Sequence, residues 1–157
     1  MGSRGSDATE IGYLVKQAQA VLNARMGEAL RPLDLSVPQY ACLEQLRRQP
    51  GITSSELARR AFVTRQSMNV VLHGLAERGL VTRSEQPGPR KQIFAELTDA
   101  ARDLVDRASE RVARVTTRMT QPLDEAGRAA LISALATCRD ALGTPLGDGR
   151  AEEKTDD

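Results

Sequence analysis

One stretch, residues 51–98, constrains the fold more than any other part of the chain. It contains two short helical patterns separated by a turn, followed by a hairpin with basic residues near its tip. Thr53 and Thr64 each precede a helical pattern as N-cap residues, and Thr53 with Glu56 fits a capping box. Gly79 predicts a left-handed helix end. Helix, turn, helix and hairpin in this order predict a winged helix-turn-helix.

The second helical pattern has one apolar side and one polar side. Met68, Leu72 and Leu75 recur at helical spacing and predict the buried face. The polar residues gather in the first turns, where a recognition helix meets base edges in the major groove. Arg can bridge the two acceptors of guanine, and Gln or Asn can pair with adenine. The predicted DNA contacts here are Thr64, Arg65, Gln66, Ser67, Asn69 and His73.

The predicted wing is a two-stranded hairpin. Residues 80–83 read as a strand, residues 84–91 contain two prolines and a glycine and read as a loop, and residues 92–97 read as the returning strand. Cations on such a hairpin lie beside phosphates or in the minor groove. The predicted wing contacts are Arg83, Arg90 and Lys91.

Positive charge is concentrated in this part of the chain. Residues 47–102 contain ten Arg or Lys and five Asp or Glu, a net charge of +5, whereas the whole chain carries +1. Helix-turn-helix spacing alone also occurs in helical pairs that only pack together. The local excess of cations favours a polyanion partner, and double-stranded DNA is the partner we predict. The alternative is a winged helix that docks another protein without touching DNA.

Long helical patterns on both sides of the winged segment predict a dimerisation region. Residues 10–30 carry a continuous apolar stripe, and Val105, Ala108, Val112, Val115 and Met119 repeat at alternating steps of three and four. Packing against the chain's own core is the alternative. We expect a homodimer, because these stripes exceed what the winged segment can cover. The predicted organisation is a disordered tail over 1–8, dimerisation helices over 9–34 and 99–143, a DNA-binding region over 35–98, and a disordered tail over 144–157.

Four short motifs together resemble the MarR family of transcriptional regulators, and the resemblance extends over roughly residues 9–143. The resemblance implies a mainly α, six-helix winged-helix fold with a two-stranded wing and an intertwined helical dimer. The motifs are SELARR at 55–60, TRQSMN at 64–69, AERGLVTR at 76–83 and ELTDAA at 96–101.

The resemblance also implies a function: a regulator, in many members a repressor, that binds a pseudo-palindromic operator. A small phenolic or anionic effector releases many such proteins from DNA. Tyr13 and Tyr40 are candidates to line an effector pocket, with core packing as the alternative for both. The chain departs from the family pattern at Pro89, where the wing usually has an acid, and at Val70 and Gly74, where polar or basic residues are frequent.

Other classes of site find little support in the sequence. The only histidine, His73, has no evident nucleophile partner, so we expect no catalytic residue, and two distant cysteines cannot form a structural zinc site. We therefore expect no metal and no cofactor. Cys42 and Cys138 read as small buried hydrophobes, and a cysteine-based redox switch is the alternative. No stretch predicts a membrane span or a signal peptide, so we expect a cytoplasmic protein.

Overall fold

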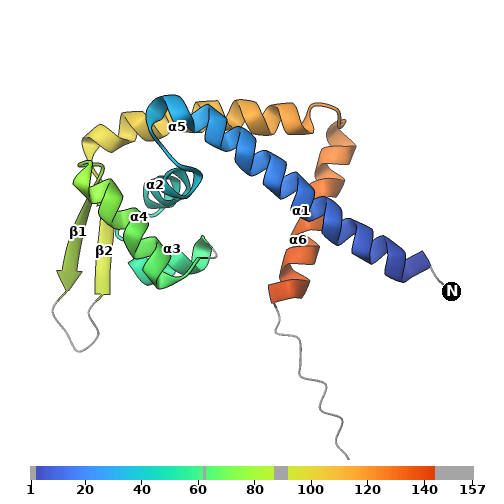
Figure 1. The fold of residues 1–157 in the computed structure, drawn as a ribbon, viewed down its shortest axis with the longest axis horizontal. Coiled ribbons are helices and arrows are strands. Elements are labelled where there is room, and N and C mark those ends of the chain that lie inside the picture. Colours follow the sequence, from blue (N-terminus) through green and yellow to red (C-terminus); the bar gives the residue numbers. More distant parts are fainter. Residues whose placement is uncertain (1–2, 62, 87–91, 144–157) are drawn as a thin grey trace, which may run out of the picture. The chain divides into compact units, whose positions relative to one another are not determined.

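The computed structural model describes residues 3–61, 63–86 and 92–143. Within these ranges the chain forms six α-helices and one antiparallel hairpin, which confirms the predicted fold class (Figure 1). The chain divides into two compact units between Met119 and Thr120. The elements are α1 (Ser3–Leu30), a 3₁₀ turn η1 (Arg31–Leu33), α2 (Val37–Arg48), α3 (Ser54–Arg60), α4 (Arg65–Glu77), β1 (Val81–Gln86), β2 (Gln92–Leu97), α5 (Asp99–Thr120) and α6 (Glu125–Gly143).

α1 begins earlier than the sequence analysis suggested. Residues 3–8 form its first turns, whereas a disordered tail was expected there. Residues 3–9 contain no proline, and extending an existing helix costs far less than starting one. The Thr9 hydroxyl donates to the Gly5 carbonyl at 2.9 Å within this segment. The whole of the expected C-terminal tail, residues 144–157, lies outside the described residues.

Polar caps begin several of the helices. Ser36 and Gln39 form a complete capping box at α2: the Gln39 amide donates to Ser36 Oγ, and the Ser36 amide donates to Gln39 Oε1. At α3 the Thr53 hydroxyl accepts from the Glu56 amide at 3.2 Å, as expected. The Glu56 carboxylate, however, pairs with Arg59 and Arg60 of its own helix, because guanidinium groups one turn away compete for it.

The wing is longer than predicted on its first strand. β1 continues through residues 84–86, which the sequence analysis assigned to the loop, and these residues pair with residues 92–94 of β2. The backbone ladder does not require apolar side chains where a hairpin projects into water. At the base of the wing the Ala95 amide donates to the Ile52 carbonyl at 3.4 Å, which attaches the segment before α3 to β2.

One hydrophobic core holds the first unit together. It brings together buried residues of α2, α3 and α4, the base of the hairpin and the first half of α5. Val105, Ala108 and Val112 of α5 are buried in it, whereas Val115 is half-buried and Met119 is exposed. The alternating stripe of α5 therefore serves the chain's own core along its first half only.

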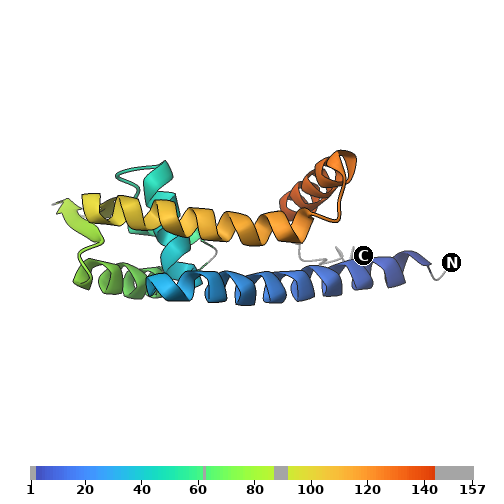
Figure 2. The ribbon, with the colours of Figure 1, turned by 90° about the horizontal axis from the view of Figure 1, so that it is seen from above.

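Two helices carry exposed apolar residues in the single chain. On α1 these are Ile11, Leu14, Val15 and Val21, and on α6, described by itself, they are Leu131, Ile132, Leu135 and Leu142. Asp124 caps the start of α6, because its Oδ1 accepts from the Gly127 amide at 2.7 Å. In Figure 2 both α1 and α5 extend away from the winged part, and Figure 1 shows that the two helices diverge along their length. Across the described ranges, no helix combines the length and apolar character that a bilayer crossing requires.

Candidate nucleic-acid interface

α4 is fixed at both ends by local hydrogen bonds. At its start the Thr64 hydroxyl accepts from the Ser67 amide at 3.1 Å and donates to Ser67 Oγ at 2.9 Å. At its end Gly79 has a φ of +68°, and the Leu80 amide donates to the Leu75 carbonyl at 3.0 Å. Both predicted ends are confirmed. Thr64 and Ser67 thus position the first turn of α4 in addition to any contact that they make outside the protein.

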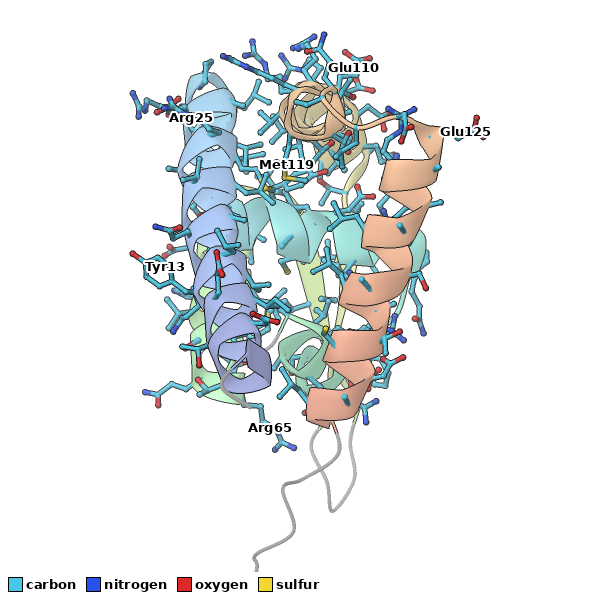
Figure 3. All side chains as sticks on the ribbon, turned by 90° about the vertical axis from the view of Figure 1, so that its right-hand side faces the viewer. Tyr13, Arg25, Arg65, Glu110, Met119 and Glu125 are labelled. Atoms are coloured by element: carbon cyan, nitrogen blue, oxygen red, sulfur yellow. The ribbon has the colours of Figure 1, made fainter. Side chains whose placement is uncertain are left out.

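The two sides of α4 differ as the sequence predicted. Met68, Leu72 and Leu75 are buried, and the polar residues of the first turns are exposed or half-buried. Figure 3 shows the Arg65 side chain extending away from the ribbon. An open depression, which we call the α4–wing depression, lies on this outer side and is lined by Arg65, Gln66, Asn69, Val70, His73 and Arg83.

Arg83 joins this group from the wing. It is exposed and pairs across the hairpin with Ala95, which is buried. Because side chains alternate between the faces of a strand, Arg83 lies on the same face of β1 as the buried Val81. Farther along the strand this face opens into the α4–wing depression, so the hairpin places a guanidinium beside the exposed side of α4. Arg90 and Lys91, the other two predicted wing contacts, lie outside the described residues.

The remaining polar groups of α4 are held to different degrees. His73 Nε2 lies 3.4 Å from Glu77 Oε1, and both side chains are exposed. Asn69 is half-buried, and its Oδ1 has no hydrogen-bond partner among the described residues. A buried polar atom without a partner is a group that an incoming base or a water molecule can satisfy.

Five of the seven predicted DNA contacts in the described ranges line the α4–wing depression: Arg65, Gln66, Asn69, His73 and Arg83. The other two, Thr64 and Ser67, form the cap at the start of α4. Val70, the apolar departure noted in the sequence, lies exposed among the residues that line the depression. Arg78 was not among the predicted residues: its guanidinium donates to the Asp34 carbonyl at 2.6 Å and ties the end of α4 to the residue after η1.

A buried carboxylate links the winged part to α5. Glu44 of α2 accepts hydrogen bonds from Arg47 at 3.0 and 2.8 Å, from Arg48 at 2.9 Å and from Ser109 of α5 at 3.2 Å. Burial acts to raise the pKa of Glu44, but the hydrogen bonds from Arg47, Arg48 and Ser109 bring this pKa below its usual range. Arg47 also donates to Asp106 of α5 at 3.3 Å.

The predicted effector residues lie in different settings. The Tyr40 hydroxyl donates to Ser109 Oγ at 3.4 Å, so Tyr40 belongs to the contact between α2 and α5. Tyr13 is exposed on α1 and points away from the helix in Figure 3. A cavity of about 760 Å³ between α1 and α5 is lined by other residues: Ala18, Val21, Leu22, Arg25, Glu28, Ala29, Val115, Arg118 and Met119.

The two cysteines also differ. Cys42 is buried in the core, and burial raises the pKa of its thiol to about 12. Because the thiolate is the reactive form, this environment argues against Cys42 as an oxidant sensor. Cys138 lies exposed on α6, where a buried hydrophobe was expected. Its side of α6 is not covered by the unit to which it belongs. Among the described residues, no cluster of His, Cys, Asp or Glu could hold a metal ion.

The chain is similar to known transcriptional regulators in sequence and in fold. The MarR family model matches residues 33–92. The HTH-type transcriptional repressor Rv2887 of Mycobacterium tuberculosis is 40% identical over 121 residues, covering 74% of this chain and 87% of that protein.

Solved structures show the same similarity. Rv2887 in complex with DNA has a TM-score of 0.66 at 36% identity and covers 85% of this chain and 97% of that one. Rv2887 in complex with salicylic acid has a TM-score of 0.65 at 35% identity, covering 81% and 94%. The transcriptional repressor CouR bound to a 23-mer DNA duplex has a TM-score of 0.76 at 31% identity, covering 88% and 99%.

Proposed function

This chain belongs to the MarR family of transcriptional regulators, and we propose that it is a repressor that binds a pseudo-palindromic DNA operator as a homodimer. The observation that carries the proposal is the α4–wing depression, where arginine, glutamine, asparagine and histidine side chains of α4 meet Arg83 of β1. These side chains supply the donors and acceptors that read base edges, together with a cation for phosphate. The protein works in the cytoplasm, without a catalytic step.

Dimerisation sets the distance between the two copies of this surface. Apolar side chains of α1 and α6 that are exposed in one chain become covered when two copies associate, and each fully buried Leu, Ile or Val contributes roughly 1.5–3 kcal/mol. Two copies related by a two-fold axis present two α4 helices to successive major grooves about 34 Å apart. Bound protein then obstructs transcription of the adjoining gene.

Residue roles within the interface follow from their chemistry. Arg65, Gln66, Ser67 and Asn69 make base contacts, and Thr64 positions them through its cap. His73 and Arg83 contact the DNA backbone, as do Arg90 and Lys91. The Arg65 and Arg83 guanidinium groups come from different elements but border the same depression, so one duplex can meet both.

The effector is a small aromatic acid. One support is the relative whose structure holds salicylic acid. The other is the lining of the cavity between α1 and α5, where apolar side chains that suit an aromatic ring lie beside arginines that suit a carboxylate. Arg25 is engaged there by Glu28 at 2.7 Å, which leaves Arg118 as the better cation for a carboxylate. Tyr13 and Tyr40, the candidates from the sequence, do not line this cavity.

A selection from random duplexes tests the DNA-binding function. The full chain should enrich an inverted repeat, and the affinity for that repeat should fall on adding salt. Arg65→Ala should weaken binding by about 1–3 kcal/mol and relax the preference at one base pair per half-site. Arg83→Ala should weaken binding to all sequences by the same factor. It should also lower the slope of log affinity against log salt concentration by about one unit per chain.

The control is Arg107→Ala, which removes an exposed cation of α5 away from the depression. It should bind the enriched repeat as the unchanged chain does. If the full chain enriches no DNA sequence, the result supports the alternative that the winged helix docks another protein. Loss of affinity in Arg107→Ala equal to that in Arg65→Ala would show that only overall charge matters. Salicylate should release the repeat from the unchanged chain and release it less well from Arg118→Ala.

A further inference from the structure

Val70 is an apolar side chain on the outward side of α4. It is 68% exposed, whereas Met68, Leu72 and Leu75 of the same helix are buried. It lines the α4–wing depression among polar and cationic neighbours. A valine left in water forgoes the burial free energy that the other apolar residues of α4 gain. A partner that covers Val70 therefore gains from an apolar contact at that point.

The position of Val70 determines which partner group it meets. Gln66, Val70 and His73 follow at helical steps of four and three, so they lie one above another along one side of α4. Asn69 borders the same depression. If Gln66 and Asn69 face base edges in the major groove, Val70 faces them as well, because it lies one helical turn after Gln66, next to Asn69, in the same depression.

The major groove offers one apolar group on its base edges, the 5-methyl group of thymine. A valine placed against any other base edge strips water from polar atoms without replacing their hydrogen bonds, which is unfavourable. Valine is also restricted to essentially one χ1 rotamer in a helix. Its two methyl groups are therefore already oriented before binding, and little side-chain entropy is lost on contact.

We propose that Val70 selects thymine at one position of each half-site, through contact between its isopropyl group and the 5-methyl group of the base. The inference rests on the proposed DNA-binding function and adds a specificity that hydrogen-bonding side chains cannot provide. Covering one methyl group changes affinity about fourfold. A dimer covers one methyl group in each of two half-sites, which changes affinity about fifteenfold.

Deoxyuridine substitution tests the contact, because deoxyuridine differs from thymidine only by the missing methyl group. The inverted repeat enriched by the full chain is synthesised with symmetric deoxyuridine pairs at each thymine position in turn, and dissociation constants are measured at fixed salt. One position should show a loss of about fifteenfold. In Val70→Ala that loss should disappear, and in Val70→Thr, which keeps one methyl group, it should become smaller.

Val63→Ala is the matched control, since Val63 is also exposed, at 40%, but precedes α4 and does not line the depression. The loss of DNA affinity that Val63→Ala shows on deoxyuridine substitution should equal the loss that the unchanged chain shows. Equal affinity of the unchanged chain for every deoxyuridine duplex would overturn the proposal, as would an undiminished loss in Val70→Ala. Failure of the unchanged chain to enrich any duplex would instead refute the DNA-binding function itself.

Discussion

Replacing Glu44 by glutamine removes one negative charge from a buried position while keeping the size of the side chain. The Glu44 side chain is only 11% exposed, and its partners Arg47 and Arg48 are 40% and 69% exposed. Water therefore screens both ion pairs from the arginine side, and the Arg48 pair contributes little, as exposed helical pairs do. The two hydrogen bonds from Arg47 and the one from Ser109 account for most of the effect. We expect Glu44→Gln to lower the free energy of unfolding by about 1–2 kcal/mol.

The effect has a defined dependence on pH. The folded-state pKa of Glu44 lies below its ordinary value of 4.5. A carboxyl group of this kind stabilises the fold above its unfolded-state pKa, and this stability is lost as pH falls through the folded-state pKa. The difference between the unchanged chain and Glu44→Gln should therefore be constant near neutral pH. It should shrink below about pH 4.5, where the unchanged chain also loses the charge.

Urea unfolding followed by circular dichroism, at one fixed protein concentration and at several pH values, measures both quantities. Glu56→Gln is the matched control: this α3 glutamate also pairs with arginines three and four residues later, but it does not reach another element. Its effect should be smaller. The reasoning is refuted if Glu44→Gln is as stable as the unchanged chain at neutral pH, or if the difference between them grows on acidification.

Three further substitutions test individual contacts. Gly79→Ala should destabilise the protein by about 1–2 kcal/mol, because φ is +68° there although nothing lies within 4 Å of the added Cβ; an unchanged thermal midpoint would contradict this. Thr98→Val should lose about 1 kcal/mol in urea unfolding, since the Thr98 hydroxyl donates to the Gly79 carbonyl and accepts from the Ala101 amide; no loss would show that the two bonds are replaced by water. Peroxide treatment should leave DNA affinity equal in the unchanged chain and in Cys42→Ser, because the buried thiol has a pKa of about 12; a loss of affinity confined to the unchanged chain would restore the redox hypothesis.

Features of this fold that depend on neighbouring residues could be predicted from the sequence. Thr53, Ser36 and Thr64 cap their helices through amides three residues ahead, and Gly79 adopts a left-handed conformation that favours glycine. The polar side of α4 follows from helical periodicity for the same reason. Such features are determined by local geometry, which spacing alone can reveal.

Features that depend on distant partners could not be predicted. Glu44 looks like one more surface charge of α2, and only its bond with Ser109, 65 positions later, shows why it is buried. Tyr40 likewise finds its partner on α5. The extra length of β1 is invisible in its polar residues, since pairing with β2 determines it. The gathering of Arg83 with Gln66 also requires the hairpin to fold against α4.

The apolar residues that α1 leaves uncovered have a consequence for how much of this protein a cell retains. Association of two copies follows mass action, so the resistance of each chain to unfolding rises with its concentration. At low copy number a larger share of chains stays single, with Ile11, Leu14 and Val15 open to proteases and chaperones. We therefore expect a higher expression level to lengthen the lifetime of each molecule as well as to raise the fraction of time that its operator is filled.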